Sequence, residues 1–117
     1  MAQPTDSVLL RIFTGESVRV GHRPVYEVLI DKAREQHLSG ATVLRCVMGF
    51  GRTSHLHTSK VLRLSDDLPI VIEIVDTEEK IAAFMPVVDR IMPSGMATLE
   101  KVRAYRYGPA VTAVEGG

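Results

Sequence analysis

The sequence lacks several features that would mark particular classes of protein. It contains one cysteine, Cys46, so no disulfide can form within the chain. Its 14 basic residues are matched by 14 acidic ones, whereas a general nucleic-acid-binding protein would carry a basic excess. No apolar run reaches membrane-spanning length, and no signal-peptide pattern stands at the beginning. We therefore expect a cytoplasmic protein that neither inserts into a membrane nor binds nucleic acid.

The length and composition of the chain are typical of one small globular domain. The chain has 117 residues, of which 45% are hydrophobic, and a chain of this size can bury enough surface to form its own core. We expect a single domain over residues 1–117, with its core at 7–108 and a flexible tail of small residues at 109–117.

Apolar runs separated by turn residues predict the element order β-α-β-β-α-β. Four runs rich in β-branched and apolar residues indicate strands at 8–13, 41–48, 69–75 and 97–107. One amphipathic helix should begin at Pro24 and end near His37. A second should follow a cap at Asp76 or Thr77, and Pro86 should kink it because proline removes a backbone hydrogen bond. This order predicts an α+β ferredoxin-like fold, with two helices on one face of an antiparallel sheet.

The expected strands are apolar at nearly every position. The run at 8–13 reads VLLRIF and the run at 69–75 reads PIVIEIV. A sheet that is apolar on both faces needs a cover on each, and the pattern provides no third helix. We therefore expect copies of the chain to pack sheet against sheet.

A basic segment and a glycine-containing turn form a candidate ligand site. Residues 36–65 include no acidic residue, and a positive segment of this kind can attract an anionic ligand, although a solvated basic face would look the same. Within it the run GFGR at 49–52 follows the second strand, where glycine lets the backbone approach a ligand and arginine can bind phosphate. The turn opens a polar loop at 52–67, and loops of this length are usually functional or disordered.

These motifs resemble those of the PII signalling proteins, in which a strand of the form G-x-T-V runs into G-F-G-R. The chain is more similar still to the PII-like family called domain of unknown function 190, and the resemblance covers about residues 7–108. The segments that carry it are LRI at 10–12, GES at 15–17, GATVLR at 40–45, GFG at 49–51, HT at 57–58 and LPIVIEIVD at 68–76.

The resemblance implies a homotrimer of ferredoxin-like subunits that binds an adenine nucleotide in clefts between neighbouring subunits. The residues implied in nucleotide binding are Gly49, Phe50, Gly51 and Arg52 of one subunit and Arg103 and Arg106 of the adjacent one. The phosphate loop of PII proteins is shortened here to PSG at 93–95. Because a shorter loop makes fewer phosphate contacts, this favours AMP, ADP or a cyclic nucleotide over ATP. Thr53 stands where PII proteins have a glutamine that helps to hold magnesium and 2-oxoglutarate, which argues against 2-oxoglutarate sensing, and no metal is expected.

The same resemblance implies a regulatory protein rather than an enzyme. Bound nucleotide would order the 52–67 loop, and the ordered loop would bind or release a partner such as a membrane transporter or channel. A structural trimer without a ligand is an alternative.

The loop at 15–23 supports a second alternative, a small phosphatase or hydrolase. It leads into a helix N-terminus, which is a ready anion site, and Glu16, Arg19 and Arg23 are possible anion or ligand contacts there. Acylphosphatases share the fold and use an arginine in this loop, but they also need an asparagine, and the chain contains none. The loop can equally be a shaping and capping segment.

Two further site types are weakly supported. His55 and His57 would lie on one face of an extended segment, but two ligands are too few for a metal, so contact with a ligand phosphate or loop packing is the better interpretation. An RNA-recognition motif would need aromatic residues on its central strands, and the run at 69–75 has none.

Overall fold

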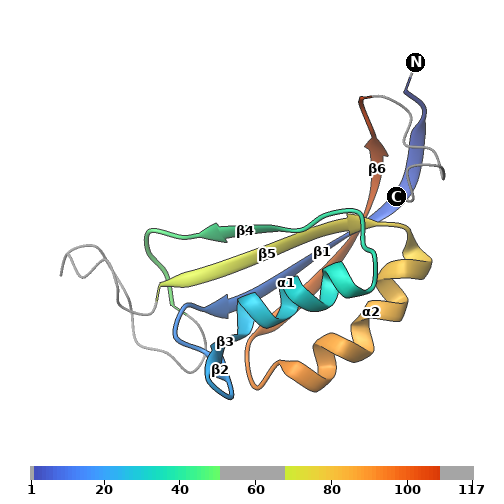
Figure 1. Ribbon diagram of the computed structural model, residues 1–117. Helices are drawn as coiled ribbons and strands as arrows, with labels where there is room; N and C mark the ends of the chain where they lie inside the picture. The colour runs from blue at the N-terminus through green and yellow to red at the C-terminus, as the bar shows by residue number, and fades with distance from the viewer. Residues whose placement is uncertain (1, 51–67, 109–117) are drawn as a thin grey trace.

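The structure is a computed structural model, and it describes residues 2–50 and 68–108. Four strands form an antiparallel sheet in the order β4-β5-β1-β6 (Figure 1). Their bounds are Pro4–Gly15 for β1, Thr42–Arg45 for β4, Pro69–Asp76 for β5 and Met96–Tyr105 for β6. With one helix between β1 and β4 and another between β5 and β6, this order confirms the ferredoxin-like α+β fold.

The segment expected to be a plain loop contains a small two-stranded hairpin instead. Strands β2 (Arg19–Val20) and β3 (Arg23–Pro24) pair with each other and not with the main sheet. Gly21 lies between them with a φ of 64°, a left-handed conformation that suits glycine in a tight turn. The connection expected as a loop at 14–23 therefore includes a short hairpin that was not anticipated.

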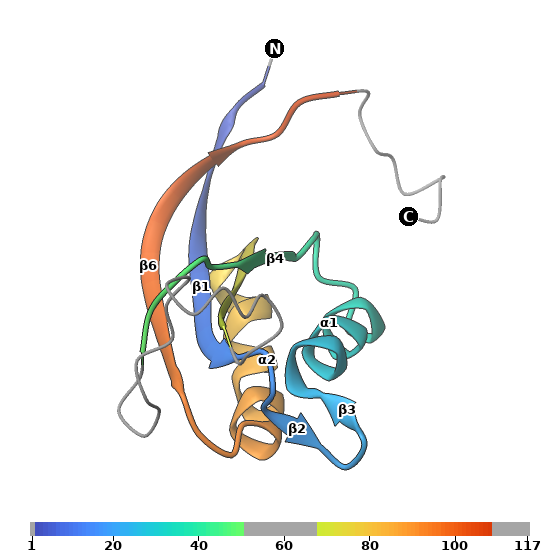
Figure 2. The same ribbon diagram turned by 90° about the vertical axis from the view of Figure 1, so that its left-hand side faces the viewer.

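Both helices pack on the same face of the sheet (Figures 1 and 2). Helix α1 (Val25–Glu35) begins one residue later than expected, with Pro24 at its N-cap, and ends two residues before His37. Helix α2 (Glu78–Ile91) is capped by Thr77, whose side chain accepts a hydrogen bond from the backbone N–H of Lys80 at 3.2 Å. It continues as one helix through Pro86.

The core lies between the helices and one face of the sheet. Strands β1 and β5 alternate between buried and half-buried positions, as strands must when successive side chains point to opposite faces. The largest fully buried side chains come from both layers: Phe84, Leu10, Ile12, Leu29, Ile72, Ile74, Ile81 and Val25. Each contributes about 1.5–3 kcal/mol through burial, so this layer accounts for the fold of a single chain.

The opposite face of the sheet, called here the outer face, is covered by no helix of the described chain (Figure 1). Its central positions are Leu9, Arg11 and Phe13 of β1 and Val71, Glu73 and Val75 of β5, all half-buried. Four of these six are apolar, which is the pattern expected of a face that needs a further cover.

Two strands run on beyond the rest of the sheet. Residues 4–7 of β1 pair only with residues 102–105 of β6, whereas β5 joins β1 from Val8 onward. The resulting two-stranded ribbon projects from the body next to the N-terminus of the chain (Figures 1 and 2).

Candidate functional site

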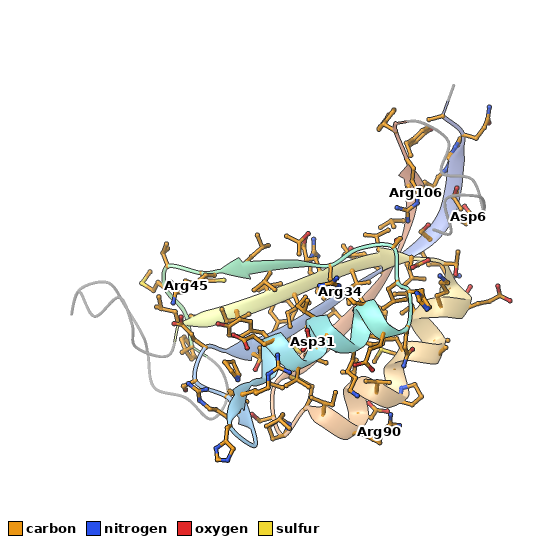
Figure 3. The ribbon with its side chains drawn as sticks, viewed as in Figure 1. Asp6, Asp31, Arg34, Arg45, Arg90 and Arg106 are labelled. Atoms are coloured by element: carbon orange, nitrogen blue, oxygen red, sulfur yellow. The ribbon has the colours of Figure 1, made fainter. Side chains whose placement is uncertain are left out.

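The residues implied in nucleotide binding lie at two opposite ends of the sheet. Gly49 and Phe50 follow β4, and Gly49 lies beside Pro69, at the start of β5. Arg106 lies beside Val75, near the end of β5. Six residue steps of an antiparallel strand separate these points by about 20 Å. Within one chain the two groups of residues are therefore far apart. In Figure 3 the labelled Arg45, the last residue of β4, marks the first end and Arg106 the second.

The first end is the loop base, formed where β4 leaves the sheet. The backbone N–H of Cys46 donates to Pro69 O at 2.9 Å, which joins the chain before the 51–67 segment to the chain after it. Gly49 is packed so closely on the proline ring that a Cβ there would lie 2.9 Å from Pro69 Cγ. Phe50 is 71% exposed, so an apolar ring is presented to solvent beside the turn. Gly51, Arg52, His55 and His57 lie outside the described residues.

The second end gathers polar groups around Ser39. The Arg106 guanidinium donates to Ser39 Oγ at 3.1 Å and to Val75 O at 3.5 Å. The buried Asp76 carboxylate accepts from the backbone N–H groups of Ser39 at 2.8 Å and Thr77 at 2.7 Å. Both of these acceptors are neutral oxygens, which leaves the charge of Arg106 available to an anion.

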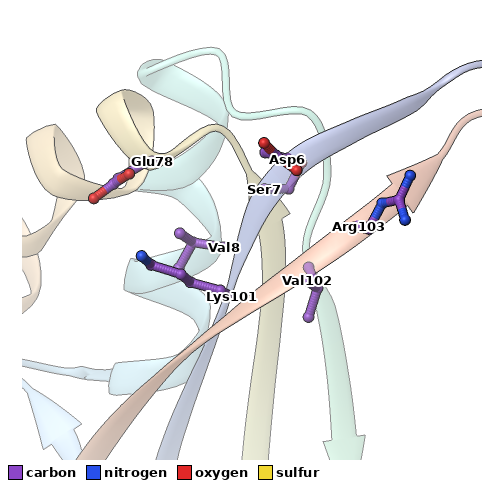
Figure 4. A pocket seen from close by; sticks show the side chains of 7 residues that line it. All are labelled: Asp6, Ser7, Val8, Glu78, Lys101, Val102 and Arg103. Atoms are coloured by element: carbon purple, nitrogen blue, oxygen red, sulfur yellow. The ribbon is translucent and has the colours of Figure 1, made fainter.

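A cavity of about 360 Å³ opens near this end, at the root of the ribbon (Figure 4). It is lined by Asp6, Ser7, Val8, Glu78, Lys101, Val102 and Arg103. Two cations and two carboxylates share it, together with the first turn of α2, whose N-terminus favours anions. Arg103 thus lies in a cavity of mixed charge, and Glu78 and Asp6 would oppose a strongly anionic group.

The charged side chains of the loop at 14–23 are engaged by other groups of the chain. Arg23 pairs with Asp31 at 2.8 Å and with Glu27 at 3.5 Å, both on α1. The hydrogen bond to Asp31 raises the pKa of Arg23 above its ordinary value. Arg19 donates to His22 O at 3.3 Å, and Glu16 pairs with Arg45. A phosphate would have to displace two carboxylates from Arg23, which argues against an arginine cradle here.

Three charged residues of the outer face were not anticipated from the sequence. Arg11 pairs with Glu73 at 2.9 Å and with Glu100 at 3.0 Å, so one side chain links β5, β1 and β6. Part of the signal was present, because the runs at 8–13 and 69–75 each contain a single charged residue, but only the strand register shows that these residues meet.

Metal binding finds no support in the described residues. Over 2–50 and 68–108, no three His, Cys, Asp or Glu side chains are grouped so that they could hold an ion. Neither of the two described helices is long and apolar enough to cross a membrane.

The fold is that of a PII-like protein. The chain is similar to CPII, a nitrogen regulatory PII-like protein from Thiomonas intermedia solved with ADP, AMP and bicarbonate, with a TM-score of 0.62, 18% identity, and coverage of 89% of this chain and 92% of that one. A chain from Thermus thermophilus described as a PII-like signaling protein gives a TM-score of 0.63 at 15% identity, covering 87% and 92%.

The sequence then gives the family. Residues 7–104 match the model of the DUF190 family, described as "Uncharacterized ACR". A UPF0166 protein from Aquifex aeolicus is 42% identical over 94 residues, 80% of this chain and 89% of the relative. A second one from the same organism is 31% identical over 98 residues, 84% and 96%. The chain belongs to the DUF190 family, which confirms the resemblance carried by its motifs.

Proposed function

We propose that this protein is a PII-like regulator that binds an adenine nucleotide, of the AMP or ADP class, in clefts between copies of the chain. The nucleotide would lie between the loop base of one subunit and Arg106 of the next. It would act on the 52–67 loop, through which the protein would signal to a partner such as a membrane transporter or channel. The protein is then a cytoplasmic binding protein and not an enzyme.

The observation that carries the proposal is the separation of the two groups of candidate residues. Gly49 and Phe50 lie about 20 Å from Arg106 within one chain, since β5 runs between them. A nucleotide cannot contact both groups of the same copy, but it can lie between the loop base of one copy and Arg106 of another. The solved CPII structure with ADP and AMP supports the choice of ligand.

The outer face supports the assembly that such clefts require. Its centre is apolar apart from the charged group around Arg11, and no described helix covers it. Packing of three copies through this face would give each chain its second cover, and would place neighbouring subunits close enough to share a ligand.

The hydrolase alternative is less well supported. Its phosphate-binding arginine would be Arg23, which is engaged by Glu27 and Asp31. Catalysis in this loop would require both carboxylates to release Arg23.

Thermal unfolding with AMP, ADP, ATP and cyclic AMP, followed by calorimetric titration, tests the proposal. A ligand at 100 times its dissociation constant should stabilise the protein by about 2.7 kcal/mol. Arg106→Ala and Arg52→Ala should weaken binding of AMP and ADP, because each removes a cation from the proposed cleft. Arg90→Ala, an exposed position in the last turn of α2, is the matched control and should bind as the wild type does.

The outcomes separate the candidate functions. Saturable binding without turnover supports the regulator. Turnover of a phosphate ester that is lost in Arg23→Ala would replace it with the hydrolase. Absence of any stabilisation by nucleotides would leave a trimer without a nucleotide ligand.

A further inference from the structure

Glu16 contacts the chain on both sides of residues 46–67, the segment that contains the Gly49–Phe50 turn. It lies directly after β1, and its backbone N–H donates to Leu68 O at 2.9 Å, just beyond that segment. Its carboxylate pairs with Arg45, the last residue of β4, just before the segment. The end of β1 is thereby joined to both flanks of the turn.

The two partners of this ion pair are unequally buried. The Glu16 side chain is 14% exposed and the Arg45 side chain 59%. Glu16 Oε1 is buried and has no hydrogen-bond partner among the described residues, and the same is true of Thr14 Oγ1, two residues earlier in the chain. A buried carboxylate that lost Arg45 would keep its desolvation cost without its charged partner. The carboxylate therefore holds Arg45 in place.

The turn itself is connected to Glu16 through Pro69. Pro69 follows Leu68 and pairs with Gly15, the residue before Glu16. It also accepts the Cys46 hydrogen bond and packs against Gly49. A shift of the end of β1 relative to β4 would therefore disturb two contacts of Pro69 at once, the hydrogen bond from Cys46 and the packing against Gly49.

We propose that Glu16 is a positioning residue. Through its contacts with Arg45 and Leu68 it fixes the position of the Gly49–Phe50 turn. The claim about the turn depends only on the contacts above, whereas its effect on nucleotide affinity rests on the proposed function. Arg45 acts here as the partner of Glu16 and does not bind phosphate.

Hydrogen exchange of single backbone amides, followed by NMR, tests the geometric part. Glu16→Gln keeps the size of the side chain and removes its charge. The Cys46 amide, bonded to Pro69 O, should exchange about tenfold faster or more, because local opening at the loop base becomes easier. The Ser39 amide, bonded to Asp76 at the other end of β5, should exchange as in the wild type. An equal rise at both amides would mean a general loss of stability and would overturn the proposal.

Two substitutions of Arg45 separate the charge from the contact area. Arg45→Met should accelerate exchange at Cys46 as Glu16→Gln does, whereas Arg45→Lys, which keeps a cation, should restore most of the protection. Equal acceleration in both variants would overturn the role of the ion pair.

Calorimetric titration with AMP and ADP tests the functional part. Glu16→Gln should weaken binding about tenfold, and Arg34→Gln, an exposed position on α1, should not change it. If the wild type binds neither nucleotide, the proposed function fails, and the exchange data alone decide whether Glu16 positions the turn. Faster exchange at Cys46 with unchanged affinity would overturn the link between Glu16 and the ligand.

Discussion

Arg11 Nε lies 2.9 Å from Glu73 Oε2 in the middle of the outer face of the sheet. Glu100 accepts a second bond from the same guanidinium at 3.0 Å. The hydrogen bond to Glu73 raises the pKa of Arg11 above its ordinary value. A raised pKa in the folded state favours the charged form, so the stabilisation by this group is complete at neutral pH and is lost only in strongly alkaline solution.

Arg11→Met should therefore lower the melting temperature by an amount that does not change between pH 7 and pH 10. The arginine stays charged over that range, and the two carboxylates lose their shared partner at every pH in it. Thermal unfolding at three pH values measures this, with Arg34→Met as the control on an exposed helix face. A difference that vanishes as the pH approaches 10 would contradict the prediction.

A charge placed on the apolar part of the outer face should prevent assembly. Val71→Asp puts a carboxylate at a half-buried position of β5 that packing between copies would bury completely, and an unpaired buried charge is costly. Light scattering after size-exclusion chromatography should find a trimer for the wild type and a monomer for the variant. Ala83→Asp, on the exposed side of α2, should remain a trimer. A trimer in both variants would show that another surface holds the copies together.

Gly95→Ala should destabilise the protein although the residue is exposed. Gly95 has a φ of 115°, and a Cβ there would collide with the carbonyl oxygen of Phe13 and lie 2.9 Å from Met92 Cε. Backbone strain of this kind costs about 1–3 kcal/mol, before the collision is counted. Gly40→Ala, which meets nothing within 4 Å, should change the free energy of unfolding by less than about 0.5 kcal/mol. Urea denaturation compares the two, and equal effects would contradict the prediction.

Asp76→Ala should be among the more damaging polar substitutions. The carboxylate is 5% exposed and accepts hydrogen bonds from the backbone of Ser39 and Thr77, so its loss leaves two backbone N–H groups without that partner. We expect a loss of about 3 kcal/mol in the free energy of unfolding, measured by urea denaturation. Asp89→Ala, on the exposed side of α2, is the control and should cost less than about 0.5 kcal/mol. A loss below about 1 kcal/mol for Asp76→Ala would mean that the loop after α1 adapts without its anchor.

The elements and their order were accessible from the sequence because they follow from local spacing. The apolar stripe of α2 and the run of β5 each lie within one stretch of chain, so their periods can be counted directly. Element ends were less accurate, since β1 begins at Pro4 rather than at Val8 and β4 ends at Arg45 rather than at Met48. The hairpin at 19–24 was missed because two-residue strands are too short to show a period.

The candidate site was accessible only in part. The motif at 49–52 marked the loop base, but nothing in it showed that Arg106 lies at the far end of β5. The engagement of Arg23 by Asp31 was also hidden, because the sequence marked Arg23 as a possible anion contact and Asp31 as part of the solvated face of the helix.

By itself the sequence determined that this protein is an α+β domain of the DUF190 family with apolar strands, since composition, period and motif are properties of adjacent residues. Only the tertiary structure decided which charged groups meet. Arg11 and Glu73 are 62 residues apart, and Arg106 and Ser39 are 67 apart. The first pair depends on the register of β1 and β5, since a shift of one residue would send each side chain to the other face of the sheet. The second depends on how the fold brings the loop after α1 to the end of β6.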